Sequence, residues 1–169
     1  MEIHAFPPLY PMYSRYNLSS FPVGSLIFTK QLSVTLRSTY PTKQEMTRKE
    51  AVYYANEIAS DSHKISKDLI QTAQNYIKRH KITPKDSSFW ESFDKGNGIV
   101  ATYYNNFEIC DFDFFLQREI VEMTDWIVDT LGIYRNRWGD APLRYMTLSL
   151  FAGTDQILTR TFEYRHPCK

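Results

Sequence analysis

The feature that most restricts how this chain folds is a long segment, residues 111–132, whose apolar side chains recur every three or four positions. This spacing places them on one face of a helix. Asp111 suits the N-cap of that helix, and Gly132 suits its C′ position. The apolar positions are Phe112, Leu116, Ile120, Met123, Ile127 and Leu131.

Strand-like and helix-like segments alternate around this helix. Residues 98–109 are rich in β-branched and aromatic side chains and predict a strand that runs into a turn or loop. Residues 62–81 and 141–153 predict two more helices, and residues 156–165 alternate like a strand. Helices that alternate with strands favour an α/β fold, here a mixed sheet with flanking helices. The face expected for the first of these helices carries Ile65, Leu69, Ala73 and Ile77.

The character of the sequence changes near residue 60. Residues 1–60 are rich in Pro and Tyr at their start, and only a strand near residues 26–36 and a short helix near residues 42–59 are expected there. We expect residues 1–60 to be a poorly defined N-terminal segment, its first 40 residues loosely ordered. Residues 61–169 are expected to form the structured part.

The overall composition argues against several classes of function. The formal net charge is +1 and Lys and Arg do not cluster, so nucleic acid is not an expected partner. No stretch reaches the roughly 20 apolar residues of a membrane helix, and no signal peptide is visible. Cys110 and Cys168 permit one disulfide at most.

Asp140 is the first candidate for chemistry. It lies in "RWGDAP", where an Asp before a Pro in the first helical turn is the usual way to cap a helix. Arg137 and Trp138, however, place a cation and a flat apolar face beside this carboxylate, a mixture that suits a sugar site. The two roles are compatible.

Two further residues carry competing interpretations. Glu108 alternates with apolar neighbours and so either points to solvent from a strand, or lies at a strand end where it supports or attacks a sugar anomeric carbon. His166 follows the last strand in "YRHPC". A single His with carboxylates suits Mn²⁺, whereas the chain has no spacing typical of a zinc site.

Three segments, "YYNNFEICDFDFF", "GIYRNRWGDAP" and "YRHP", occur in this order. Their order and spacing resemble those of the fungal α-1,2-mannosyltransferases of glycosyltransferase family 15. The helix "LIQTAQNYIKRHK" and the "FWESF" after it are also similar to that family. The resemblance runs from about residue 60 to the end and implies a partial nucleotide-sugar glycosyltransferase (GT-A-like) fold.

The resemblance implies an activity and a set of roles. Members transfer mannose from GDP-mannose to mannose acceptors on glycoproteins, with Mn²⁺ and with retention of configuration, in the Golgi. Glu108 matches the glutamate near the anomeric carbon, Asp140 the aspartate of the acceptor and catalytic region, and His166 the histidine that binds manganese. The expected substrate-binding residues are Arg137, Trp138, Tyr103, Tyr104 and Asn106.

The chain also departs from the family pattern. Asn136 stands where the family has an acidic residue, Cys168 stands where it has a second Pro, and the upstream Glu-Pro-Asp segment, which supplies a metal ligand and much of the guanine-nucleotide site, is missing. We therefore expect poor Mn²⁺ affinity. The alternative to an active transferase is an inactive fragment or a mannoside-binding remnant, with Trp138, Tyr103 and Tyr104 as stacking platforms.

Overall fold

A computed structural model of the chain describes residues 25–29, 41, 43–62, 64–105 and 107–161. Its main sheet has four strands in the order β1 (Ser25–Thr29), β5 (Phe107–Asp111), β2 (Tyr53–Ala55) and β6 (Ile157–Thr159). The pairs β1·β5 and β2·β5 are antiparallel and β2·β6 is parallel, so the sheet is mixed as predicted. A second sheet is the antiparallel pair β3 (Ile58–Asp61) and β4 (Val100–Tyr103).

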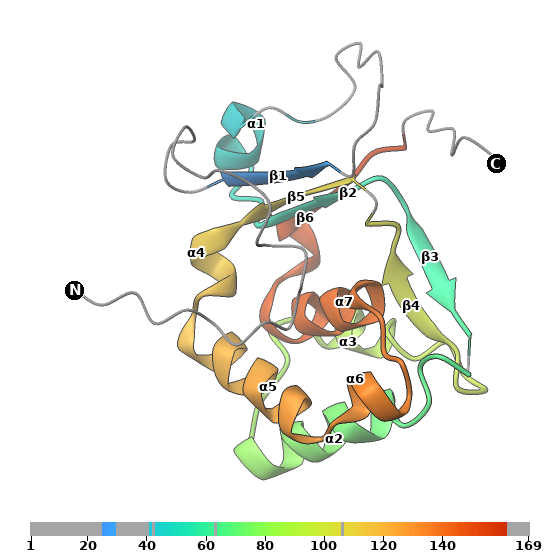
Figure 1. Cartoon of the computed structure of the whole chain (residues 1–169). Helices are drawn as coiled ribbons and strands as arrows, with labels where there is room; N and C mark the ends of the chain where they lie inside the picture. The colour runs from blue at the N-terminus through green and yellow to red at the C-terminus, as the bar shows by residue number, and fades with distance from the viewer. Residues whose placement is uncertain (1–24, 30–40, 42, 63, 106, 162–169) are drawn as a thin grey trace, which may run out of the picture.

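The helices cover the main sheet unequally (Figure 1). Helix α1 (Lys43–Arg48) lies on one side, and the remaining α-helices lie on the other, with α7 packed against β4. The short η3 (Thr154–Gln156) leads into β6. The helices of the larger layer are α2 (Leu69–His80), α3 (Ser87–Glu91), α4 (Phe112–Phe115), α5 (Arg118–Asp129), α6 (Gly132–Arg135) and α7 (Asp140–Phe151).

The two faces of the sheet form two separate cores. Side chains alternate along a strand, so neighbours in sequence face opposite layers. Tyr53 and Cys110 belong to the large core under the helices, whereas Tyr54 and Ile109 belong to a smaller core with Met46 of α1. The same alternation turns Glu108 toward the helical layer, and this orientation places it in the candidate site.

The helix predicted over residues 111–132 is interrupted. Asp111 caps its start as predicted, accepting a hydrogen bond from the Asp113 amide at 3.0 Å. The chain then leaves helical geometry at Gln117, which divides α4 from α5. The prediction that Gly132 is the C′ residue is wrong: Leu131 takes the positive φ of 55°, and Gly132 begins α6.

The strand that runs into a turn, predicted over residues 98–109, is confirmed by β4, but the second strand, β5, which follows the turn, was not expected from the sequence. The division near residue 60 stays a prediction. Strand β2, which precedes that point, lies between β5 and β6, and its tyrosines are fully buried. The expectation that the first 40 residues are loosely ordered falls almost entirely outside the described residues.

The remaining elements follow the sequence more closely. Leu69 and Ala73 are buried on α2 as predicted, but Ile65 precedes that helix and is 41% exposed. Helix α7 lies in the segment predicted over residues 141–153 and ends at Phe151. Strand β6 takes up only Ile157–Thr159 of the strand predicted over residues 156–165, of which residues 162–165 lie outside the described residues. No helix within the described residues is long and apolar enough to cross a membrane.

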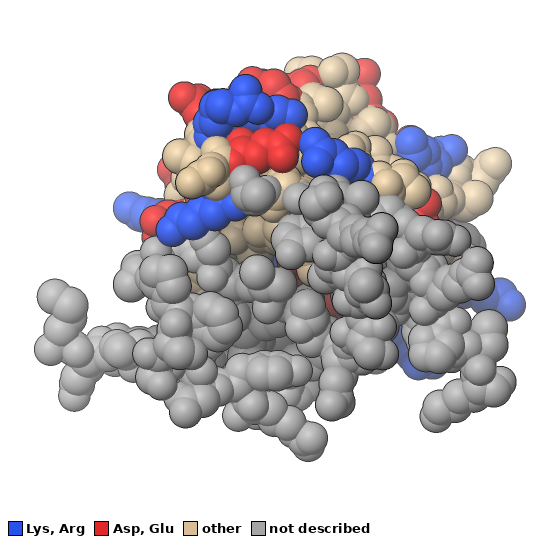
Figure 2. Space-filling model, turned by 90° about the horizontal axis from the view of Figure 1, so that it is seen from above, with Lys and Arg blue, Asp and Glu red and all other residues tan. Residues whose placement is uncertain are grey.

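Charges on the face above α1 are mixed. Figure 2 shows basic and acidic side chains next to one another on the described part of this face. Glu45, for example, lies 3.4 Å from the Lys49 ammonium and 2.9 Å from the Arg160 guanidinium. Because neither sign prevails there, this part of the surface does not form the basic patch expected of a nucleic-acid interface.

Candidate functional site

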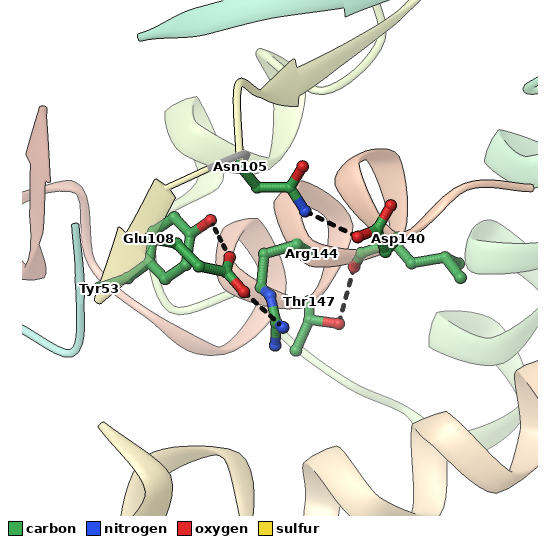
Figure 3. A network of polar contacts seen from close by, with 7 residues as sticks. Tyr53, Asn105, Glu108, Asp140, Arg144 and Thr147 are labelled. Atoms are coloured by element: carbon green, nitrogen blue, oxygen red, sulfur yellow. Dashed lines mark hydrogen bonds and ion pairs between the residues drawn. The ribbon is translucent and has the colours of Figure 1, made fainter. Parts of the chain in front are cut away.

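Glu108 is a buried carboxylate held by two donors. It is 5% exposed, so of the two interpretations given for it, the one in which it points to solvent is wrong. The Tyr53 hydroxyl donates a hydrogen bond to its Oε2 at 2.5 Å, and the Arg144 Nη2 donates to its Oε1 at 3.1 Å (Figure 3). Each carboxylate oxygen therefore has its own donor, and the donors come from different elements, β2 and α7.

The strand register explains why Tyr53 reaches Glu108. In the antiparallel pair β2·β5, Tyr53 is opposite Cys110 and Ala55 is opposite Glu108. Tyr53 and Glu108 are thus diagonal neighbours on one face of the sheet, within reach of a long aromatic side chain.

Burial fixes the protonation of two groups beside the carboxylate. Burial, followed by the negative charge of Glu108, raises the pKa of Tyr53 well above its ordinary value, so its hydroxyl keeps the proton that it donates. Burial raises the pKa of the Cys110 thiol to about 11. Cys110 is therefore a protonated core residue at neutral pH and not a reactive nucleophile.

Asp140 lies at the start of α7 but does not cap it. The N-cap is Gly139, and no side chain bonds to the helix start there, so the prediction of Asp140 as the cap is wrong. Its carboxylate is exposed and accepts a hydrogen bond from the Asn105 amide at 3.1 Å (Figure 3). An acidic group in the first turn is favoured by the helix dipole.

The structure places the aromatic candidates mainly in the core. Trp138 is 4% exposed and its indole N–H donates to the Lys67 carbonyl at 2.7 Å. Tyr103 is 1% exposed and stacks on Tyr145 with ring centroids 4.7 Å apart. In this structure neither ring presents the open face that stacking on a sugar requires.

The other expected residues are less confined. Arg137 is exposed and has a φ of 59°, and Tyr104 is half-buried with its amide bonded to the Glu57 carbonyl at 2.9 Å. Asn106 and His166 lie outside the described residues. The structure thus brings Glu108 and Asp140 to one side of α7.

Metal ligands do not gather in the described part of the chain. Among those residues, no three His, Cys, Asp or Glu side chains come close enough together to hold a metal ion. The described residues alone therefore do not fit a manganese site.

Sequence reasoning missed Tyr53 and Arg144. Arg144 follows Asp140 by four residues, which is one helical turn, so it was detectable as a neighbour on the same helix face. Tyr53 gave no such signal, because its approach to Glu108 depends on which strands pair.

The chain matches a family and several of its members. The family model described as "Glycolipid 2-alpha-mannosyltransferase" matches residues 33–167, which begins upstream of the boundary expected near residue 60. O-glycoside alpha-1,2-mannosyltransferase homolog 2 of Schizosaccharomyces pombe is 31% identical over 92 residues, covering 53% of this chain and 25% of that protein. Probable mannosyltransferase KTR4 of Saccharomyces cerevisiae is 29% identical over 92 residues, covering 54% of this chain and 19% of that protein. The match therefore spans about a quarter or less of these relatives' length.

Solved structures share the fold. Core-mannan synthase A of Aspergillus fumigatus, in its Mn/GDP form, superimposes with a TM-score of 0.63 at 22% identity, over 71% of this chain and 35% of that one. Ktr4p of S. cerevisiae in complex with GDP gives 0.61 at 24% identity, over 69% and 32%. The mixed α/β fold is thus that of these glycosyltransferases. The family model matches most of the length of this chain, which shows that the chain belongs to the glycolipid 2-alpha-mannosyltransferase family, glycosyltransferase family 15.

Proposed function

We propose that this chain carries out α-1,2-mannosyl transfer from GDP-mannose to a mannose-terminated glycan or glycoprotein, with retention of configuration. Its family supports mannosyl transfer, and the GDP bound to the solved Ktr4p supports a guanosine-diphosphate donor. The observation that carries the proposal is the buried Glu108 carboxylate, whose oxygens are held by Tyr53 and Arg144.

In this proposal Glu108 acts on the donor sugar. When the bond from the anomeric carbon to the diphosphate breaks, positive charge develops on the sugar ring. A fixed carboxylate in a site with little water stabilises that charge without reorganising during the reaction. Tyr53 contributes by holding Oε2, since its raised pKa keeps it a donor.

Asp140 is proposed to act on the acceptor. Its carboxylate is exposed at the start of α7 and is oriented by the Asn105 amide. It is therefore able to accept a hydrogen bond from an acceptor hydroxyl and to take its proton as the new glycosidic bond forms. We assign the exposed Arg137, together with Tyr104 and Asn106, to substrate binding, and Trp138 and Tyr103 to the support of these residues from the core.

The metal and the location are also proposals. Core-mannan synthase A was solved with manganese and GDP, and we keep His166 as the proposed manganese-binding residue of this chain. The described residues hold no complete ligand set for the ion, so the roles of Glu108 and Asp140 do not depend on one. Family membership supports a place in the Golgi and secretory pathway.

The test is a transfer assay with the purified chain, Mn²⁺, GDP-mannose and methyl α-mannoside, with the product linkage read by proton NMR. We expect an α-1,2-linked dimannoside, and no product when UDP-glucose replaces the donor. Binding of the mannoside without any product would contradict the proposal and support a mannoside-binding remnant. Absence of both binding and product would contradict both functions.

A further inference from the structure

We propose that Arg144 is a positioning residue that holds Glu108 in its reactive orientation and couples it to Asp140. The inference rests on the proposed function and assigns a further residue to that site. Arg144 is not expected to touch the substrate; it acts through the carboxylate that it contacts.

The first support is the way the two Glu108 oxygens are divided between donors. Arg144 Nη2 lies 3.1 Å from Oε1, and the Tyr53 hydroxyl lies 2.5 Å from Oε2. A carboxylate held at one oxygen can still turn about its terminal torsion, which is broad and soft. Donors from two separate elements fix the plane of the group.

The second support is that Arg144 is itself fixed. Its guanidinium lies 4.6 Å from the centroid of the Phe115 ring, which restricts where the planar group can turn. The exposed fraction of its side chain is 12%, and that of Glu108 is 7%. Water competes little for such a pair, so its geometry is better defined than that of a surface ion pair.

The third support is that a gain in stability does not explain why the Arg144–Glu108 ion pair is buried. Removing two charges from water has a large cost, and buried ion pairs often contribute little net stability. A pair that places a reactive carboxylate gives the burial a functional reason.

The fourth support is the position of Arg144 on α7. It follows Asp140 by one helical turn, so both side chains leave the same side of the helix. The Asn105 amide bonds to Asp140, and Arg144 bonds to Glu108 (Figure 3). Helix α7 is thereby attached at two points to the segment that carries Glu108, and the donor-side and acceptor-side carboxylates keep a fixed relation.

The test compares Arg144→Ala and Arg144→Lys with the native chain in the mannosyl transfer assay. We expect Arg144→Ala to lower kcat roughly 100-fold, the order of loss from a misplaced catalytic group, with a KM for the mannoside close to that of the native chain. Arg144→Lys keeps the charge and is expected to lose less. The matched control is Arg118→Ala, which breaks an exposed Arg–Glu pair on α5 and should leave kcat unchanged.

Chemical rescue separates positioning from packing. Millimolar guanidinium ion should restore part of the kcat of Arg144→Ala, whereas urea, which has the same shape and no charge, should not. In a Glu108→Gln background, Arg144→Ala should cause less than about a threefold further loss, because the residue through which it acts is already disabled.

If the native chain is active, any one of three results would overturn the inference. The first is a kcat for Arg144→Ala within about threefold of the native value, and the second is equal rescue by urea and guanidinium. The third is a loss of kcat from Arg144→Ala that is as large in the Glu108→Gln background as in the native chain. If the native chain transfers no mannose, the proposed function fails separately. In that case the contact between Arg144 and Glu108 is tested by the free energies of unfolding of the native chain, the two single variants and the double variant. If the changes of the two single variants add up to that of the double variant, the two residues are not coupled and the inference is overturned as well.

Discussion

Three packed, buried tyrosines extend from the Glu108 carboxylate into the large core. Tyr53 donates to it, Tyr103 packs against Tyr53 with ring centroids 5.0 Å apart, and Tyr145 stacks on Tyr103. Burial is the largest cause of the raised pKa of each of these three groups. Such a phenol keeps its proton in the folded protein but loses it in the unfolded chain at alkaline pH. The free energy of unfolding therefore falls as the pH rises in that range.

Tyr103→Phe tests this linkage. The unfolded phenol ionises above about pH 10, whereas folded Tyr103 keeps its proton, so its contribution is complete below that pH and is lost as pH rises. In urea titrations between about pH 9.5 and 11, the free energy of unfolding should fall less steeply in the variant, by up to about 1.4 kcal/mol per pH unit. Tyr134→Phe, at a residue that is 72% exposed, is the control. An identical slope in the native chain and Tyr103→Phe would show that burial does not hold this proton.

At the scale of elements, the segment between α6 and α7 packs through a close contact between Trp138 and Gly132. The Trp138 ring occupies the space where a side chain at position 132 would lie, and a Cβ there would come within 2.1 Å of the ring. Gly132 is therefore required by packing and not by a positive φ. The glycine expected to end one helix thus begins α6 and packs against the buried Trp138.

Gly132→Ala should consequently destabilise the chain. The methyl group must displace the indole, which donates to the Lys67 carbonyl, and overpacking of this kind typically costs about 1–3 kcal/mol. Gly139→Ala is the matched control, because its Cβ would meet only Pro142 at 3.6 Å. Thermal unfolding should show a lower Tm for Gly132→Ala than for Gly139→Ala, and equal Tm values would contradict this account of the glycine.

At the scale of the whole molecule, the part of the fold that the sequence predicted is the part set by local periodicity. The alternation of helices and strands, the cap at Asp111 and α7 follow from side-chain patterns alone. Glu108 and Asp140 are candidates from their sequence neighbours, and the resemblance implies the role of each. The structure adds their hydrogen-bond partners and the position of both beside one face of α7.

What could not be predicted depends on long-range pairing. Tyr53 joins Glu108 only because β2 lies beside β5, and the order of strands in a sheet is not written in either strand. Strand β2 was not expected for the same reason, since its three residues give too short a period to recognise. Asp140 was misassigned as a cap because an Asp before a Pro suits the N-cap and the first helical position alike.

The most direct test of the central claim is the kcat of Glu108→Gln for mannosyl transfer from GDP-mannose to methyl α-mannoside. The substitution keeps the size of the side chain and one acceptor oxygen, but it replaces the other oxygen with an amide donor and removes the charge. We predict a loss of about 10²–10³-fold or more in kcat, the range for losing a preorganised electrostatic group, with mannoside affinity little changed. Glu122→Gln, on the exposed face of α5, should retain native activity. A Glu108→Gln chain that transfers mannose at a rate similar to the native chain would contradict the claim that this carboxylate serves the reaction.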